Sequence, residues 1–244
     1  MSGAIAPGTI HGVGLGPGSA DLMSVRADRL VRGARHVAYF HKRGKQGQAR
    51  RIVDGMLRDD VVEFPMEYPV TTEIPLSDPA YANSLSGFYA DCAAHLRALA
   101  GSGEDVVVLC EGDPFFYGSF MHLYARVSGA VPVQVVPAIT GMSAAWTATG
   151  APITWGDDVL TVAPATLPAD ELTRRIKDTD ALVVMKIGSN LPKLKAAIEA
   201  AERMDQAWLV EYAAMPEERV VPLALVDTAP YFSSALIHGQ GRRP

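Results

Sequence analysis

The chain has 244 residues, enough for one large domain or two small ones. Its formal net charge of −5, with 20% charged residues, speaks against the basic surface that general nucleic-acid binding requires. Only two cysteines occur, so a secreted disulfide scaffold is not expected and a reducing cytoplasm fits better. The N-terminus lacks a signal-peptide pattern and no apolar run reaches the ~18 residues of a membrane span, so we expect a cytoplasmic protein without a membrane segment.

The first part of the chain alternates predicted strands with predicted helices. An apolar strand at 10–15 ends in a glycine-rich turn, and a helix follows that Ser19 would cap and Gly33 would end, with Val25 on its buried face. Further strands are predicted at 36–40, before Pro65, at 104–110 and at 131–137, and further helices at 81–101 and 120–127. This alternation favours an α/β domain with a largely parallel sheet.

The pattern changes after Pro137. A helix rich in small residues is predicted within 138–152, and later helices near 168–177 and 191–203. Strand-like runs occur at 157–164, 180–188, 205–213, 218–225 and 233–239. Because the last runs follow one another without a helical crossover, we expect a mixed or antiparallel sheet. The predicted organisation is an N-terminal α/β lobe at 1–136 and a C-terminal α/β lobe at 137–244.

The turn "GVGLGPG" at 12–18 has two interpretations. Glycines let a ligand or another backbone approach closely, which favours a ligand-binding loop. The G-x-G-x-G spacing of Gly14, Gly16 and Gly18 differs from the dinucleotide fingerprint, and no Walker lysine follows. A tight strand-to-helix turn without a ligand is the alternative, and the spacing leaves both open.

A second special turn, "CEGDPFFYGS", follows the clearest apolar strand of the chain. The carboxyl ends of parallel strands form the ligand crevice of an open α/β sheet, so we expect both turns to face the same crevice. Asp113 would orient backbone amides there or accept from a hydroxyl group. The alternative role for Asp113 is to stabilise its own turn.

Five segments resemble the tetrapyrrole methylase family in their order and spacing, over nearly the whole chain. They are "GVGLGPG", "EGDPFFYGS", "VVPAITGMSAA", "VVMKIG" and "EYAAMPEERVV". The resemblance implies a two-lobed fold around a cleft, with a mostly parallel N-terminal sheet and a mixed C-terminal sheet. It also implies S-adenosylmethionine as cofactor, bound between the lobes, a tetrapyrrole substrate over the N-terminal lobe, and a homodimer.

Within the family, "EFPMEYPV", "GDPFFYGSF", "VVMKIG" and "APYFSSALI" look most like the branch that methylates C20 of precorrin-2 in corrinoid synthesis. A cobalt-containing substrate stays open, as does methylation of a protein or an RNA ribose by another member of the superfamily. Outside the family, a dinucleotide-dependent oxidoreductase and a non-catalytic tetrapyrrole carrier are the alternatives. Histidines and cysteines show no close ligand spacing, so no metal site is expected.

The family motifs imply a set of cofactor-binding positions. These are Pro17, Glu111, Gly112, Asp113, Phe116, Thr140, Gly141, Met185 and Ala213. Met185 and Ala213 could instead be core residues, and Thr140 could simply cap a helix. The glycines Gly14, Gly16 and Gly18 would keep the floor of the active site low beneath a flat macrocycle, and Pro17 would stiffen that floor.

The chain also departs from the family pattern. Ser19 stands where an aspartate is common, and Ala138 replaces a glycine. Relatives that methylate uroporphyrinogen carry an aspartate base at about the position of Phe40, so this chain lacks the easiest candidate for a general base. The candidates for accepting the proton that C20 must lose are Tyr39, His41 and Tyr117. A solvated loop position is the alternative for His41.

A basic stretch at 41–51 carries no acidic residue. Its lysines and arginines are Lys42, Arg43, Lys45, Arg50 and Arg51. A precorrin carries many carboxylates, and guanidinium groups pair with carboxylates bidentately. The stretch is therefore predicted to clamp the acidic edge of the macrocycle, a solvated surface loop being the alternative.

Overall fold

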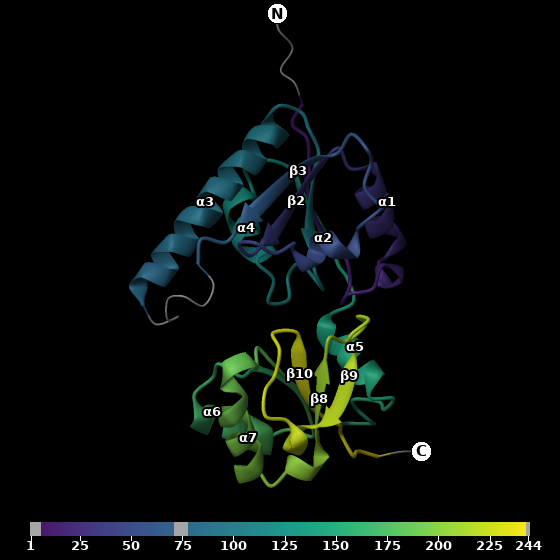
Figure 1. Cartoon of the computed structure of the whole chain (residues 1–244), viewed down its shortest axis with the longest axis vertical. Helices are drawn as coiled ribbons and strands as arrows, with labels where there is room; N and C mark the ends of the chain where they lie inside the picture. The colour runs from purple at the N-terminus through teal and green to yellow at the C-terminus, as the bar shows by residue number, and fades with distance from the viewer. Residues whose placement is uncertain (1–5, 71–77, 243–244) are drawn as a thin grey trace, which may run out of the picture. The chain divides into compact units, whose positions relative to one another are not determined.

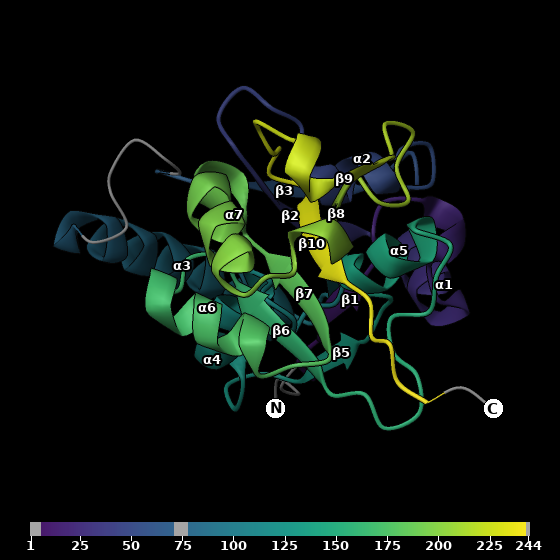
Figure 2. The same ribbon diagram turned by 90° about the horizontal axis from the view of Figure 1, so that it is seen from below.

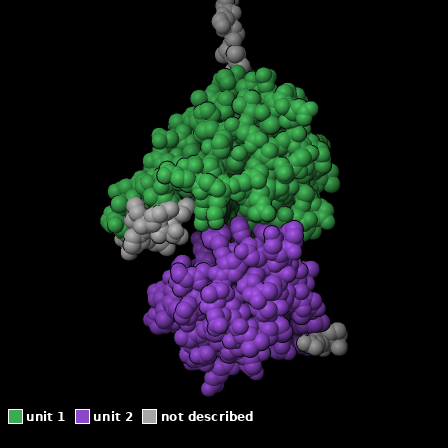
Figure 3. All heavy atoms as spheres, in the orientation of Figure 1, with its two compact units in different colours: residues 1–140 green, residues 141–244 purple. Residues whose placement is uncertain are grey.

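The computed structural model describes residues 6–70 and 78–242. The chain divides into two compact units, unit 1 (Met1–Thr140) and unit 2 (Gly141–Pro244), coloured separately in Figure 3. This division falls after Thr140, whereas the sequence pattern predicted a boundary near Pro137. None of the helices in the described ranges combines the length and apolarity of a membrane span.

Unit 1 is built on a five-stranded sheet with the order β3-β2-β4-β1-β5. Its strands are β1 (Ile10–Gly14), β2 (His36–His41), β3 (Val62–Glu67), β4 (Val106–Cys110) and β5 (Val133–Val136). Every pairing in the sheet is parallel, which confirms the predicted parallel sheet. All five carboxyl ends therefore lie along one edge.

Helices cover both faces of this sheet (Figure 1). One face packs against α1 (Val25–Gly33) and α2 (Gln48–Ile52), and the other against α3 (Pro79–Gly101) and α4 (Phe120–Val127). Strands β1 and β4 are buried along their whole length, as expected of central strands in a doubly covered parallel sheet.

The start of α1 differs from the sequence prediction. The hydroxyl of Ser24 accepts a hydrogen bond from the amide of Ala27 at 3.1 Å, so Ser24 is the N-cap. Ser19 precedes only a short 3-10 turn and makes no side-chain cap bond, so its prediction as the N-cap was wrong. Val25 is 82% exposed, so its prediction on the buried face was wrong: Ala27 and Val31 form the buried stripe, and a residue two positions before Ala27 points to the opposite side of the helix.

Unit 2 carries a second five-stranded sheet, with the order β6-β7-β10-β8-β9. Its strands are β6 (Leu160–Pro164), β7 (Ala181–Met185), β8 (Ala207–Glu211), β9 (Arg219–Pro222) and β10 (Ser233–Ile237). Only β6 and β7 pair in parallel, and the other neighbours are antiparallel, which confirms the expected mixed sheet.

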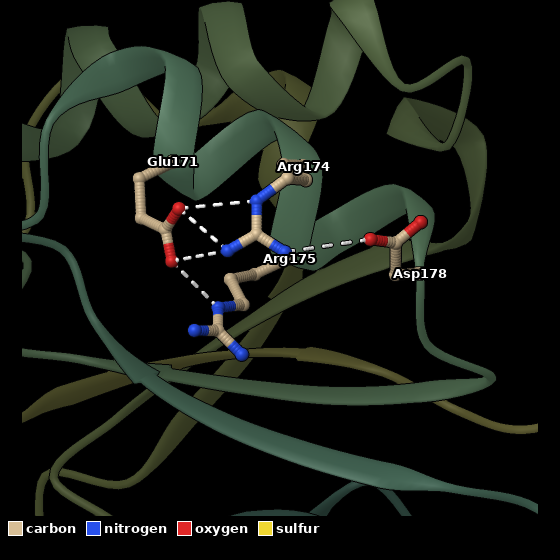
Figure 4. A network of polar contacts seen from close by, with 4 residues as sticks. All are labelled: Glu171, Arg174, Arg175 and Asp178. Atoms are coloured by element: carbon tan, nitrogen blue, oxygen red, sulfur yellow. Dashed lines mark hydrogen bonds and ion pairs between the residues drawn. The ribbon is translucent and has the colours of Figure 1, made fainter.

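The two faces of the second sheet are covered differently. Helices α6 (Ala169–Lys177) and α7 (Leu191–Ala200) pack side by side on one face (Figure 1 and Figure 2). The short helix α5 (Gly141–Ala148) packs on the other face, against Val183 and Val210. On the exposed side of α6, Glu171 pairs with Arg174 and Arg175 at 2.7 Å each, as Figure 4 shows.

Candidate active site

The loops after β1 and β4 are joined at the carboxyl edge of the first sheet. The amide of Gly112 donates to the carbonyl of Gly16 at 2.8 Å, and the amide of Leu15 donates to the carbonyl of Cys110 at 2.9 Å. The glycine-rich turn and the second turn therefore lie against each other, at the edge where ligands of open α/β sheets bind.

Asp113 connects the loop after β4 to the loop after β5. One carboxylate oxygen accepts from the amide of Phe115 at 2.9 Å, and the other accepts from the amide of Ala138 at 3.0 Å. Asp113 thus stabilises its own turn and also orients a backbone amide from a distant segment, which combines both roles considered from the sequence. Two motif segments are held together by this one side chain, and the bond between Gly112 and Gly16 adds the glycine-rich turn as the third.

The close packing of these loops explains two of the glycines. A Cβ atom at Gly14 would lie 2.6 Å from the Cβ of Ala138 and 2.8 Å from the carbonyl oxygen of Gly112. Gly16 adopts φ +83°, a left-handed conformation that glycine takes without steric cost. The chain's own segments therefore demand a bare backbone at Gly14 and Gly16, whatever else approaches it; Gly18 is half-buried and Pro17 is buried.

Unit 2 gathers the candidate residues of the C-terminal motifs in one cluster. Met185 ends β7 and Ala213 follows β8, and both pack, half-buried, in the cluster that also contains Met142 of α5. Gly141 is the first residue of that helix, directly after Thr140. The structure thus brings Met185 and Ala213 to the face of the sheet that α5 covers.

Several residues beside these positions have a left-handed backbone although they are not glycines. Tyr117 follows β4 with φ 55°, Lys186 follows Met185 with φ 57°, and Tyr212 and Ala214 flank Ala213 with φ 51° and 59°. Such conformations cost of order 1–3 kcal/mol and concentrate at functional sites. No local sequence pattern announces them, which is why the sequence analysis missed them.

Two of the candidate proton acceptors lie on β2 and the third lies in the loop after β4. Tyr39 and His41 are on one face of β2, with ring centroids 6.2 Å apart. Burial and the hydrogen bond with Glu63 raise the pKa of Tyr39, which makes its phenolate, the basic form, scarcer. The Nδ1 of His41 lies 3.1 Å from the carbonyl oxygen of Lys42, so Nδ1 carries the proton of that contact. Tyr117 is exposed on the loop after β4.

Phe40, which stands at about the position of a base in some relatives, belongs to an aromatic cluster. It points away from Tyr39 and stacks on Tyr68 with ring centroids 5.4 Å apart. Phe88 and Tyr89 of α3 complete the cluster, at 6.2 Å and 6.0 Å from Phe40. The side chain at this position therefore packs and has no proton-transfer chemistry.

The basic stretch is already partly paired with carboxylates. Arg50 donates to both oxygens of Glu63, at 2.9 Å and 3.1 Å, and also pairs with Asp54 at 3.2 Å. Arg43 pairs with Glu67 at 3.1 Å. These acids come from β3 and the segment before it, so the sequence of 41–51 could not reveal them. The ammonium group of Lys45 is exposed and has no partner within the described residues.

Glu111 is the carboxyl group at this edge that stands alone. It follows the last residue of β4, is half-buried, and makes no hydrogen bond or ion pair in the part of the chain that the structure describes. Burial raises the pKa of Glu111 to about 8. A half-buried carboxyl without a partner suits a cationic ligand, because such a charge would offset the cost of burying the carboxylate.

Phe116 and Thr140 complete the candidate positions of unit 1. Phe116 is half-buried beside Tyr117, with ring centroids 4.9 Å apart, and Thr140 is half-buried.

Within residues 6–70 and 78–242, no group of three or more histidine, cysteine, aspartate or glutamate side chains could hold a metal ion.

Comparison with known proteins identifies relatives over the whole chain. The model of the family "Tetrapyrrole (Corrin/Porphyrin) Methylases" matches residues 9–228. The precorrin-2 C(20)-methyltransferase of Sinorhizobium sp. is 46% identical over 100% of both chains. The protein CobIJ of Mycobacterium tuberculosis is 42% identical over 98% of this chain, which spans only 47% of that longer protein. The cobalt-precorrin-2 C(20)-methyltransferase of Salmonella typhimurium is 25% identical over 96% of this chain and 97% of that protein.

Solved structures share the fold at low sequence identity. Cobalt precorrin-4 methyltransferase, CbiF, matches with a TM-score of 0.71 and 20% identity, over 94% of each chain. The uroporphyrin-III C-methyl transferase of Thermus thermophilus, solved with S-adenosylhomocysteine, matches with a TM-score of 0.65 and 21% identity, over 96% of this chain and 98% of that one. These matches confirm the predicted fold class.

Proposed function

We propose that this chain, which belongs to the tetrapyrrole methylase family, methylates C20 of precorrin-2 to give precorrin-3A in corrin synthesis. The observation that carries this proposal is the 46% identity with a precorrin-2 C(20)-methyltransferase over the full length of both chains. Phe40 stands at about the position of the aspartate base in relatives that methylate uroporphyrinogen. The absence of that base here agrees with methylation at a different ring position.

We propose S-adenosylmethionine as the methyl donor; when bound, it supplies an electrophilic methyl group on a sulfonium. Within unit 1, the residues present fit such a cation, since Glu111 offers a carboxyl group without a partner among the described residues; within unit 2, Met185 and Ala213 offer a half-buried apolar surface. The residues proposed to bind it are Pro17, Glu111, Gly112, Asp113, Phe116 and Thr140 of unit 1, and Gly141, Met185 and Ala213 of unit 2.

The chain's own contribution to this reaction is positioning. Asp113 fixes the loops after β4 and β5, and the bond between Gly112 and Gly16 fixes the glycine-rich turn. Holding two reactants in a fixed geometry can correspond to effective molarities of ~10⁵–10⁸ M. Rigid loops are therefore what a transfer between two bound molecules requires of the protein.

For the macrocycle we propose a place over the carboxyl edge of the first sheet. The turn with Gly14, Gly16 and Gly18 would form its floor. Its carboxylates would meet the basic residues of 41–51, which are Lys42, Arg43, Lys45, Arg50 and Arg51. Arg43 and Arg50 already pair with acids, so the exposed Lys45, whose ammonium group has no partner within the described residues, is more available than these two. This difference refines the clamp predicted from the sequence.

Two further properties belong to the proposal. We propose that the enzyme works in a reducing cytoplasm, which suits Cys92 and Cys110, both free and buried. A homodimer is proposed from the family resemblance, and light scattering of the purified protein tests it. Burial raises the pKa of Cys92 to about 11, so this thiol should resist thiol reagents in the native state.

The test combines binding and turnover. S-adenosylhomocysteine is titrated calorimetrically into the purified protein, and methyl transfer to precorrin-2 is then followed without and with cobalt in the macrocycle. Binding together with C20 methylation of the metal-free substrate supports the proposal. Transfer only to the cobalt form would reassign the substrate, in line with the 25% identical relative. Absence of binding would overturn the proposal as a whole.

A further inference from the structure

The loop after β4 contains a carboxyl group that the positioning role leaves unexplained. Glu111 stands between Cys110, the last residue of the strand, and Gly112, whose amide is bonded to the carbonyl of Gly16. Its backbone is thus fixed on both sides while its side chain has no partner among the residues described. Burial without a partner disfavours the charged form of a carboxyl group.

The register of the sheet places Glu111 among the candidate groups. Strands β2 and β4 run in parallel, with Val37 opposite Val107 and Tyr39 opposite Leu109. This pairing ends at Tyr39 and Leu109, and Glu111 follows in the bend after Cys110, at the carboxyl edge where β2 also ends, at His41. Glu111 therefore lies at the strand end where the macrocycle is proposed to sit.

No charged neighbour compensates Glu111. Titratable and charged side chains at or just beyond this edge include His41, Lys42 and Arg43 after β2, Glu67 at the end of β3, and Asp113 and Tyr117 after β4. None of them contributes to the raised pKa of Glu111. Asp113 is occupied by two backbone amides and Glu67 by Arg43. Burial is the single cause that raises the pKa of Glu111 to about 8, so the protein's own groups leave this carboxyl largely protonated at neutral pH.

We propose that Glu111 is the catalytic base that accepts the proton lost from C20. The assignment rests on the proposed function, and it replaces Tyr39, His41 and Tyr117 in that role. A carboxyl group changes its proton affinity strongly with the charge beside it. The positive charge of a bound methyl donor would hold Glu111 as carboxylate, ready to accept a proton.

The step balances around the transfer of that charge. The new C20–methyl bond takes its electron pair from the macrocycle, and the broken carbon–sulfur bond leaves its pair on sulfur, which becomes neutral. The positive charge passes with the methyl group to the macrocycle, which makes the C20–H bond acidic. That bond breaks, its electron pair returns to the macrocycle, which becomes neutral, and the proton goes to the Glu111 carboxylate. Glu111 thus accepts its proton after methyl transfer, when the charge has left the sulfur.

The first test measures protons rather than turnover. Wild-type protein is titrated at pH 8 with S-adenosylmethionine and with S-adenosylhomocysteine, in buffers of different ionisation enthalpy, so that the proton count is obtained for each ligand. The two ligands share their amino and carboxyl groups, so the difference reports the sulfonium charge. We expect the methionine form to release up to about half a proton more per site, because a carboxyl titrating near pH 8 is half-protonated there.

Matched variants assign the proton to its residue. Glu111→Gln should abolish the difference in proton release, whereas Glu104→Gln, at the opposite end of the same strand, should leave it unchanged. Glu104 is a suitable control because it is paired with His36 at 3.3 Å at the amino end of β4. Equal proton release by both ligands in the wild type, or an unchanged difference in Glu111→Gln, overturns the proposal without any need for turnover.

The second test separates catalysis from binding. In single turnovers with precorrin-2, Glu111→Gln should lose about 10²-fold or more in rate, the usual share of a general base. Its affinity for neutral S-adenosylhomocysteine should change less than about twofold, and Glu111→Asp should recover part of the rate. A Glu111→Gln variant as fast as wild type contradicts the assignment while the proposed function stands. Failure of wild type and Glu104→Gln alike to methylate precorrin-2 contradicts the proposed function instead.

Discussion

Each unit of the molecule uses one aspartate to tie a local turn to a remote segment. In unit 1, Asp113 accepts from the amide of Phe115 in its own turn and from Ala138 after β5. In unit 2, Asp158 accepts from the amide of Trp155 at 2.8 Å in its own turn and from Gly241 at 3.2 Å near the end of the chain. The same bonding pattern thus serves two different places.

The difference between the two aspartates lies in what surrounds them. Asp113 joins loops at the carboxyl edge of a parallel sheet, beside the unpaired Glu111 and the left-handed Tyr117. Asp158 joins a turn to the segment that leaves β10, and no proposed site residue is adjacent to it in the sequence. A carboxylate that accepts from two segments therefore stabilises the fold in both units. The groups beside it determine whether it also positions residues of a binding site.

The largest effect should come from filling the space at Gly14, between the segments that Asp113 joins. The added methyl group of Gly14→Ala would overlap the Gly112 carbonyl and Ala138. Ala138 is held by its bond to Asp113, and Gly112 is held by its bond to the Gly16 carbonyl. We expect a loss of about 3 kcal/mol in the free energy of unfolding, measured by urea denaturation. Gly87→Ala, on the exposed side of α3 with nothing within 4 Å, should instead be neutral or stabilise by up to about 1 kcal/mol. Equal losses would mean that loop packing is not tight at Gly14.

Asp113→Ala should have the next largest effect. The substitution leaves the amides of Phe115 and Ala138 without their acceptor, and Ala138 lies half-buried. We expect about 2 kcal/mol of destabilisation, since an unsatisfied buried donor costs roughly 1–3 kcal/mol. Because the proposed cofactor loops would also lose their fixed positions, calorimetry should show clearly weaker binding of S-adenosylhomocysteine. Undiminished binding by a folded Asp113→Ala protein would separate this aspartate from the site.

Asp158→Ala is the matched change in unit 2 and should be milder. It removes the acceptor for Trp155 and Gly241, but the bond to Gly241 is longer, at 3.2 Å. We expect about 1 kcal/mol of destabilisation by the same urea measurement. Affinity for S-adenosylhomocysteine should stay as in wild type. A fall in affinity equal to that of Asp113→Ala would remove the distinction drawn between the two aspartates.

The two aspartates also show what the sequence could and could not reveal. Asp113 stands in a Gly-Asp-Pro turn directly after a strong apolar strand, so a local pattern marks it, and alternation of strands and helices indicates the parallel sheet around it. Asp158 accepts from the amide of Gly241, 83 positions away in the chain. The sequence indicates this contact only indirectly, through the glycine. A Cβ atom at Gly241 would lie 2.7 Å from the carbonyl oxygen of Trp155, so glycine is required there. Long-range contacts of this kind depend on the folded topology, which no short window contains.

The same limit applies to the candidate site. Motifs located Asp113, Gly112 and Met185, because family order and spacing are properties of the sequence. The pairing of Arg50 with Glu63 and the unpaired state of Glu111 are properties of neighbouring strands, and they changed which residues we regard as available. The left-handed backbone of Lys186 and Ala214 had no signal, since neither residue type favours that conformation.

The smallest effect is expected for a carboxylate whose partners are all local and exposed. Glu171 pairs with Arg174 and Arg175 on its own helix (Figure 4), and the hydrogen bond with Arg174, followed by that with Arg175, lowers the pKa of Glu171. A lowered pKa contributes stability that is present above the unfolded value of 4.5 and is lost as the pH falls through the folded pKa. Glu171→Gln should therefore lower Tm at pH 7 by less than about 2 °C, less still in 1 M salt, and not at all near pH 2. Thermal scans at these pH values check this prediction. A loss of stability as large as that of Asp158→Ala would contradict the comparison, because it would show that a carboxylate with only local partners stabilises this protein as much as one that joins distant segments.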